Sequence, residues 1–263
     1  MLPEVFIKAV RDDRRILTGW VTGAAAAGVA YASFYPQVSG GRMVDAIAGY
    51  PPAMREAFRL DDLNSAAGYL GSSVFGLILP LIAVFYGAAT GARLVAGDEE
   101  SGRLGLVLAH PASRTALVLQ RFAALAVGAS LLAAVVLLGM VAIRPAAELS
   151  DVTVAELGAQ CLNLALLAIV FGALAIGIGA AFGKRILVFA VTAIIGIGAY
   201  ALHSLGGQLG IERGRYFSPF HYYIGGEPLK NGWQLADAGT LLAVALVLVA
   251  IGAFWFNRRD LHS

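Results

Sequence analysis

Residues 157–183 read LGAQCLNLALLAIVFGALAIGIGAAFG, a run of 27 positions without a charged side chain. A helix rises about 1.5 Å per residue, so this run is long enough to cross roughly 30 Å of hydrocarbon. Five further uncharged runs lie at residues 16–41, 63–92, 122–143, 186–211 and 238–257. The sequence therefore predicts an all-α membrane protein with six spanning helices.

The composition agrees with this prediction. Hydrophobic residues make up 59% of the 263 positions and charged residues 14%, against roughly 25% charged residues in a soluble domain. Because six spans and their loops use nearly the whole chain, we expect one transmembrane domain, residues 1–263. A net charge of +2 gives no indication of a nucleic-acid partner. The expected spans are residues 16–36, 71–92, 116–143, 157–182, 186–205 and 236–256.

The distribution of basic residues predicts the orientation. With both termini on one side, that side holds 12 of the 19 Lys and Arg residues, and its loops are the shorter ones. Basic residues favour the cytoplasmic side, so both termini are expected there. Arginine strongly outnumbers lysine, and Ala and Gly are abundant, as in GC-rich bacterial genomes. We therefore expect a multi-pass protein of a bacterial cytoplasmic membrane.

The N-terminal stretch EVFIKAVRDDRR, residues 4–15, has the pattern of an amphipathic helix on the membrane surface. An ordinary charged flank before the first span is the alternative. The uncharged run continues past the small residues at 30–32, so we expect an uncleaved span and not a secretory signal. The apolar face would consist of Val5, Phe6, Ala9 and Val10.

A punctuated segment, GDEESGRLGLVLAHPASRTALVLQ, separates the second and third runs at residues 97–120. Asp98 suits a helix N-cap, with Glu99 and Glu100 in the first turn, where the helix dipole favours negative charge. Pro111 would end this helix. The pattern predicts a short cytoplasmic helix over residues 98–109.

The middle of that segment carries an apolar ridge, because Leu104, Val107 and Leu108 follow helical spacing. Ser113 can then cap the third span. A solvated turn between spans needs no such ridge. Two interpretations remain: the helix docks into a groove on a cytoplasmic partner, or it rests on lipid headgroups.

The segment resembles the cytoplasmic loop of ABC type-2 export permeases in its pattern E-E-x-G-x-L, leucine-rich stretch and H-P-A-S-R. The resemblance extends to the amphipathic start, the six spans, the SPF motif at 218–220 and the terminal FNRRDL at 256–261. The stretches at 60–63 and 66–70 look like the actinobacterial antibiotic-exporter branch. The matching loop positions are Glu99, Glu100, Gly102, Leu104, Pro111, Ser113 and Arg114.

This resemblance implies partners and a mechanism. Two permease subunits, identical or different, would form the pathway, and two cytoplasmic ABC ATPase subunits would drive it. Residues 98–109, including Arg103, would be the coupling helix seated in the ATPase. The resemblance also implies export, with a hydrophobic or amphipathic substrate such as a drug, an antibiotic or a lipid.

The chain itself lacks ATPase motifs, so it is not expected to be an enzyme. GIGAAFGKR at 177–185 lacks the first glycine and the final Ser or Thr of a phosphate-binding loop. SLGGQ at 204–208 resembles an ABC signature with two letters exchanged but lies near an outer span end. We expect no cofactor in this chain and Mg-ATP in a partner subunit.

Small residues predict where helices pack closely. Gly19 and Gly23 form a GxxxG motif in the first span, and Ala175, Gly179 and Gly183 form a small-residue face in the fourth. Contact within the chain or with a second subunit is expected for these faces. For Gly19 and Gly23, chance exposure to lipid is the alternative.

The last outer loop, residues 206–234, is rich in aromatic side chains. An aromatic belt at the membrane interface is one interpretation. The resemblance suggests another, a re-entrant hairpin that gates the outer exit, with Gly225, Gly226 and Pro228 providing the break. The candidate gate residues are Tyr216, Phe217, Pro219, Phe220, Tyr222 and Tyr223.

Asn163 is a polar residue inside the fourth span, and we expect an interhelical hydrogen bond or a contact on the substrate path. His203 and His221 lack carboxylate companions in sequence, so no metal site is expected. Two rival functions remain, a gradient-driven carrier and a membrane scaffold or sensor. The carrier is disfavoured because a proton- or sodium-driven carrier usually keeps an acidic residue inside a span, and none lies in the interior of an expected span here.

Overall fold

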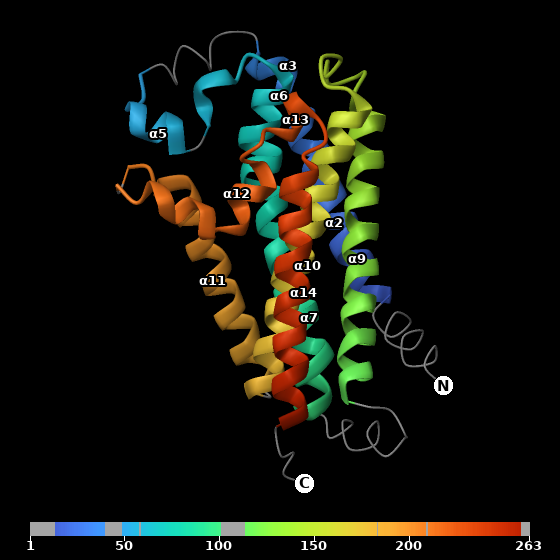
Figure 1. Ribbon diagram of the computed structural model, residues 1–263. Helices are drawn as coiled ribbons and strands as arrows, with labels where there is room; N and C mark the ends of the chain where they lie inside the picture. The colour runs from blue at the N-terminus through green and yellow to red at the C-terminus, as the bar shows by residue number, and fades with distance from the viewer. Residues whose placement is uncertain are drawn as a thin grey trace.

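The computed structural model describes most of the chain: residues 14–39, 49–57, 59–100, 114–182, 184–208 and 210–258. All regular elements among these residues are helices, and six segments are long and apolar enough to cross a membrane. Figure 1 shows these segments running side by side. Their main helices are α2 (Arg14–Ala32), α7 (Leu79–Glu100), α9 (Arg114–Ile143), α10 (Val154–Phe182), α11 (Arg185–Leu205) and α14 (Leu235–Arg258). The six-span all-α prediction is confirmed.

Most of the short helices gather toward one end of the bundle, which we name the loop end (Figure 1). The opposite end, where α2 begins and α14 ends, is the terminal end. The predicted surface helix at residues 4–15 lies outside the described residues apart from its last two, which begin α2. The short helices are α3 (Tyr35–Val38), α5 (Pro52–Ala57), η1 (Leu60–Asp62), α6 (Ala66–Tyr69), η2 (Leu70–Ile78), η3 (Glu212–Phe217), α12 (Pro219–Ile224) and α13 (Pro228–Asn231).

The second span contains a nine-residue π-helix, η2, which the sequence pattern did not predict. The span begins with α6 at Ala66, earlier than the expected residue 71, and the Leu79 N–H bonds the Val74 carbonyl five residues back. A Cβ at Gly76 would overlap the carbonyl oxygen of Gly71. Glycine at 76 therefore suits the wider π turn. Such turns are uncommon and frequently mark functional sites.

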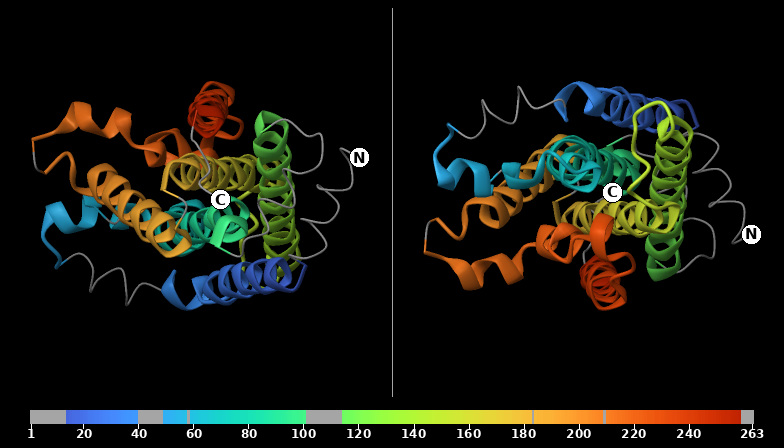
Figure 2. Two further views of the ribbon diagram at one scale, coloured as in Figure 1. Left: turned by 90° about the horizontal axis from the view of Figure 1, so that it is seen from below. Right: turned by 90° about the horizontal axis from the view of Figure 1, so that it is seen from above.

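Helix α10 is the central helix of the bundle. Within its spanning window 72% of the residues are buried, whereas the figures for the α2 and α11 segments are 22% and 28%. Figure 2, seen along the bundle, shows α10 beside α7, α9 and α14 while α2 and α11 lie at the margin. Among the described residues, four spans are thus buried to a third or less, and the α2 and α11 segments are the least buried of them.

Glycines let α7 and α10 approach closely. A Cβ at Gly87 would lie 2.5 Å from the Ala168 carbonyl oxygen, and one at Gly91 would lie 2.6 Å from both the Gly172 carbonyl oxygen and the Ala175 Cβ. In a membrane, where helix association depends on packing, such small-residue contacts are stabilising. The Gly87–Gly91 motif and its partner Gly172 were not among the predicted packing residues.

Two of the three residues in the predicted small-residue face of α10 are buried in the structure. Ala175 is fully buried against Gly91, and Gly179 is buried. Gly183 lies outside the described residues. Helix α10 has a second close approach, to α14, because a Cβ at Gly252 would lie 2.9 Å from the Gly177 Cα.

Gly19 and Gly23 do not pack against any residue that the structure describes. Both residues are exposed on α2, and a Cβ at either would meet nothing within 4 Å. Contact with another helix of the same chain, one of the expected outcomes, is therefore not observed. Contact with a second subunit remains a prediction.

Candidate functional site

The aromatic segment after α11 is set into the bundle near the loop end. In Figure 1, α11 ends lower than α9 and α10, and α12 lies where α10 and α14 run beside it. Ser218 begins α12, since its Oγ accepts a hydrogen bond from the Phe220 N–H at 3.3 Å and Pro219 takes the first helical position. The same hydroxyl donates to the Ala199 carbonyl at 2.8 Å, which ties α12 to α11.

Tyr223 fastens α12 to two further helices. Its fully buried hydroxyl donates to the Phe75 carbonyl in η2 at 2.9 Å. Its own carbonyl accepts from the Asn163 amide nitrogen in α10 at 3.2 Å. Asn163 is 2% exposed and does not line the cavity described below. The structure thus shows it in the interhelical hydrogen bond, the first of its two expected roles.

The six candidate gate residues divide into two groups. Phe220 and Tyr223 are buried, whereas Tyr216 and Phe217 are 59% and 88% exposed. Phe220 packs against Phe171 of α10 and Tyr200 of α11, with ring centroids 5.9 and 5.3 Å apart. Pro219 and Tyr222 are partly buried. The buried pair anchors the segment, and the exposed pair faces outward.

A cavity of about 250 Å³ lies between η2, α11, η3 and α12. Its lining includes the hydroxyl-bearing Ser72, Tyr200 and Ser204, the imidazole of His203, and several glycines. Its charged lining residues, among those the structure describes, are Arg59, Arg215 and Glu227. Polar side chains therefore line much of the cavity, together with Phe220, Tyr223 and Ile224.

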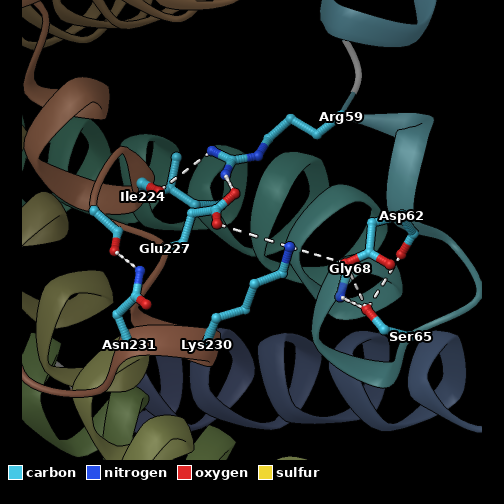
Figure 3. A network of polar contacts seen from close by, with 9 residues as sticks. Arg59, Asp62, Ser65, Gly68, Ile224, Glu227, Lys230 and Asn231 are labelled. Carbon is cyan, nitrogen blue, oxygen red and sulfur yellow. Dashed lines mark hydrogen bonds and ion pairs between the residues drawn. The ribbon is translucent and has the colours of Figure 1, made fainter.

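An ionic network borders this cavity and joins two loops (Figure 3). Arg59 Nη2 lies 2.8 Å from Glu227 Oε1, and Arg59 Nη1 donates to the Ile224 carbonyl at 3.2 Å. Lys230 Nζ lies 2.8 Å from Asp62 Oδ2 and 3.7 Å from Glu227 Oε2. Two cations and two anions therefore connect the loop before α6 with the loop before α14.

Asp62 is held by a local turn as well as by Lys230. Ser65 Oγ donates to Asp62 Oδ2 at 2.7 Å and accepts from the Gly68 N–H at 3.0 Å, which caps α6. Burial alone would raise the pKa of Asp62, but the hydrogen bonds from Lys230 and Ser65 outweigh it and the pKa is lowered. The hydrogen bond with Asp62 raises the pKa of Lys230, against the effect of burial. Both groups are charged at neutral pH.

At the terminal end, the acidic residues 98–100 lie at the end of α7 and not at the start of a new helix as predicted. Helix α7 continues to Glu100, so Asp98 does not begin a new helix. Glu100 Oε1 accepts a hydrogen bond from the Arg185 N–H at 2.9 Å, at the start of α11. The carboxylate therefore stabilises the N-terminus of α11, where the helix dipole favours negative charge, and not that of its own helix.

His203 and His221 lie near each other, with ring centroids 6.3 Å apart, although 18 positions separate them in sequence. Tyr216 packs edge-on against His221 at 4.7 Å. Among the described residues, no group of three or more His, Cys, Asp or Glu side chains could hold a metal ion.

The family model "Multidrug efflux system permease Rv1217c, C-terminal domain" matches residues 3–257. The chain belongs to this family. It is an actinobacterial branch of the ABC type-2 permeases, the class that the loop pattern resembles. A comparison with curated proteins gives no match.

Much of the predicted coupling segment of this efflux permease falls outside the described residues. Asp98, Glu99 and Glu100 form the last turn of α7, and Arg114 begins α9. The end of α7 and the start of α9 both lie at the terminal end of the bundle (Figure 1). The coupling residues outside the described part are Gly102, Arg103, Leu104, Val107, Leu108, Pro111 and Ser113.

The candidate gate residues Phe220 and Tyr223 line the permease cavity, but its charged residues were not predicted as site residues. Arg59 and Glu227 are 168 positions apart, and each has the sequence context of an ordinary charged loop residue. One signal was available: the charges in the first and third outer loops are of both signs, which permits pairing between the loops. The sequence does not show which charged residue of one loop pairs with which residue of the other.

Proposed function

We propose that this permease domain forms half of the pathway of an ABC exporter and is driven by two separate ATPase subunits that hold Mg-ATP. The observation that carries the proposal is the family match over residues 3–257, which includes the loop between α7 and α9. In this scheme the terminal end faces the cytoplasm, and the chain itself has no catalytic role. The substrate is hydrophobic or amphipathic.

The contacts of α7 support a role in transmitting force. Helix α7 packs against α10 and α11, and Glu100 at its last residue bonds the first residue of α11, Arg185. A partner that pushes on residues 101–113 would act on the end of α7. Because the Glu100–Arg185 hydrogen bond links the two helices there, α7 and α11 would move together.

The uncovered helices support a paired permease. The α2 and α11 segments are the least buried spans, and both lie at the margin of the bundle (Figure 2). Each carries exposed glycines, Gly19 and Gly23 on α2 and Gly198 on α11, where a Cβ would meet nothing within 4 Å. Small exposed residues allow close approach of a helix from another subunit. We therefore assign the subunit contact to these two helices.

The test is purification of the complex from its native membrane in mild detergent. We expect an ABC ATPase subunit to copurify with the wild-type chain and to be lost from Leu104→Asp, because a charge would disrupt the apolar docking ridge. Ser150→Asp, which adds an acid at the loop end, is the matched control and should retain the ATPase. If the wild type brings down no ATPase, a gradient-driven carrier or a scaffold replaces this proposal.

A further inference from the structure

The cavity at the loop end carries an excess positive charge. Of its three charged lining residues, Glu227 is already 2.8 Å from Arg59 and 3.7 Å from Lys230, so its charge is compensated. Arg215 also lines the cavity, and none of the carboxylates whose side chains the structure describes pairs with it. Among the described side chains, the guanidinium of Arg215 therefore has no counterion in this partly enclosed site.

Unsatisfied polar atoms gather around the same space. Arg215 Nε and His203 Nδ1 are both buried without a hydrogen-bond partner, and both residues line the cavity. Buried polar atoms are normally hydrogen-bonded, so each exception requires an explanation. A guanidinium donates only, and a neutral imidazole can present Nδ1 as a donor. An occupant that accepts hydrogen bonds would satisfy both.

The backbone around the cavity adopts uncommon conformations at several points. Ser72 and Gly76 reach the cavity from the π-helix η2. Arg59 and Glu227, at its border, have left-handed backbones with φ of 56° and 52°. Strained backbone of this kind gathers at binding sites, where the surrounding structure holds it in place. The uncommon backbone conformations and the unpaired donors thus both lie around this cavity.

The size of the cavity limits the ligand. About 250 Å³ is less than the roughly 300–1,000 Å³ of a complete small-molecule pocket. It would hold a carboxylate or phosphate group but not a large apolar body. Apolar side chains stand exposed on the adjoining η3 and its approach, Phe217 at 88% and Ile211 at 51%. They offer a surface where an attached tail could lie in the membrane.

We propose that this cavity, with Arg215 as its central cation and His203 and Ser204 as further donors, binds the anionic head group of an amphipathic molecule. A guanidinium binds carboxylate and phosphate through paired hydrogen bonds. The inference rests on the proposed export function and narrows its substrate class to amphipathic anions. The same chemistry would also accept the phosphate of a membrane lipid, so the experiment separates the two sources.

Binding is measured on the full chain in phosphatidylcholine nanodiscs without an ATPase. The probes are a diazirine-bearing alkyl carboxylate and its methyl ester, which has the same tail without the charge. We expect half-maximal labelling at a mole fraction about tenfold lower for the acid than for the ester. We expect Arg215→Gln to remove this preference. Arg213→Gln, an exposed neighbour on η3, is the matched control and should keep it.

A second arm adds phosphatidylglycerol to the nanodiscs. Competition with the alkyl carboxylate would support the site and identify the occupant as a lipid phosphate. Labelling without competition would support the site and identify the occupant as a transported amphiphile. Equal labelling by acid and ester, or a preference that survives Arg215→Gln, would overturn the proposal. Because no ATPase is present, these results do not depend on whether coupling occurs.

Discussion

Arg59 and Glu227 share an uncommon left-handed backbone conformation, and their side chains bind each other at 2.8 Å. Only Glu148 shares that conformation among the described residues other than glycine. The conformation costs of the order of 1–2 kcal/mol at each residue. Arg59 also donates to the Ile224 carbonyl, and Glu227 lies 3.7 Å from Lys230, so each side chain of the ion pair has a second partner. The pair therefore fixes the two loops in relation to each other.

A double-mutant cycle would measure this link. Arg59→Gln and Glu227→Gln should each lower the midpoint of thermal unfolding, and the double variant should lose less than the sum of the two. The side chains are 30% and 41% exposed, so we expect a coupling energy of about 0.5–1 kcal/mol. Strict additivity of the two changes would show that the ion pair contributes nothing to stability.

The second ion pair predicts a dependence of stability on pH. The pKa of Asp62 is lowered from 3.8. The stabilisation that its carboxylate gives the folded state is therefore complete above that value and is lost as pH falls through the folded-state pKa. The pKa of Lys230 is raised from 10.5, so its contribution is complete below that value and is lost as pH rises through the folded-state pKa. Between these two pH limits, the contribution of the ion pair to the free energy of unfolding should be constant. It should be less than about 1 kcal/mol, because both groups are partly exposed.

The unfolding midpoint of Asp62→Asn, compared with wild type from acid to alkaline pH, checks this. The two curves should stay parallel through the neutral range and converge in acid, where wild-type Asp62 is protonated. A gap that persists below the folded-state pKa of Asp62 would mean that the variant loses stability for a reason other than the charge.

The π-helix gives a prediction with an internal control. Gly76→Ala should destabilise the chain by about 1–3 kcal/mol, because its Cβ would overlap the Gly71 carbonyl oxygen and force the turn to rearrange. Gly71→Ala lies in the same helix, and its Cβ would approach only a Leu229 methyl at 3.9 Å, an ordinary contact. Unfolding midpoints of the two variants should differ clearly. Equal midpoints would show that η2 adapts without cost.

The number and type of spans could be predicted from sequence because they follow from the distribution of charge. Crossing hydrocarbon requires long uncharged helices, and each of the six runs contains one. The π-helix could not be predicted, because its hydrophobic pattern matches that of an ordinary span. The prediction that the acidic cluster at 98–100 begins a helix is wrong, because α7 continues to Glu100. The Glu100 carboxylate instead accepts a hydrogen bond from the Arg185 N–H, 85 positions away, which no local pattern predicts.

The cavity depends on long-range contacts that composition does not encode. Asn163 was recognised as polar in a span, but its acceptor, the Tyr223 carbonyl, is 60 positions away. Arg215 was counted only as a loop charge. Its importance comes from the absence of a described carboxylate partner, which is a property of the folded chain.

The contact between α7 and α10 predicts unequal costs for two glycines that look alike in sequence. Gly91→Leu should unfold or strongly destabilise the chain, because even a Cβ would lie 2.6 Å from Gly172 and Ala175 atoms. Gly19→Leu points into open space on α2 and should leave the thermal stability of an isolated chain nearly unchanged. Expression and unfolding midpoint in detergent would distinguish them, and a well-folded Gly91→Leu would refute the packing described above.

The exposed faces of α2 and α11 lead to the last prediction, which concerns the paired permease. Cys161 is the single cysteine and is buried in α10, so a Cys161→Ala background allows single cysteines to report contacts between subunits. We expect Gly19→Cys and Gly198→Cys to form crosslinked dimers with short bifunctional reagents in native membranes. Val127→Cys, 49% exposed on α9, is the control for random collisions and should stay monomeric.

Crosslinking at α2 and α11 but not at α9 would indicate that a second copy of this chain covers the two helices. No crosslink in membranes that contain only this chain, followed by crosslinking when a different six-span subunit is present with its own cysteine, would indicate a heterodimer with the same interface. Equal crosslinking at Val127 would show that the exposed faces meet lipid. In that case the small residues on α2 and α11 would have no role in assembly.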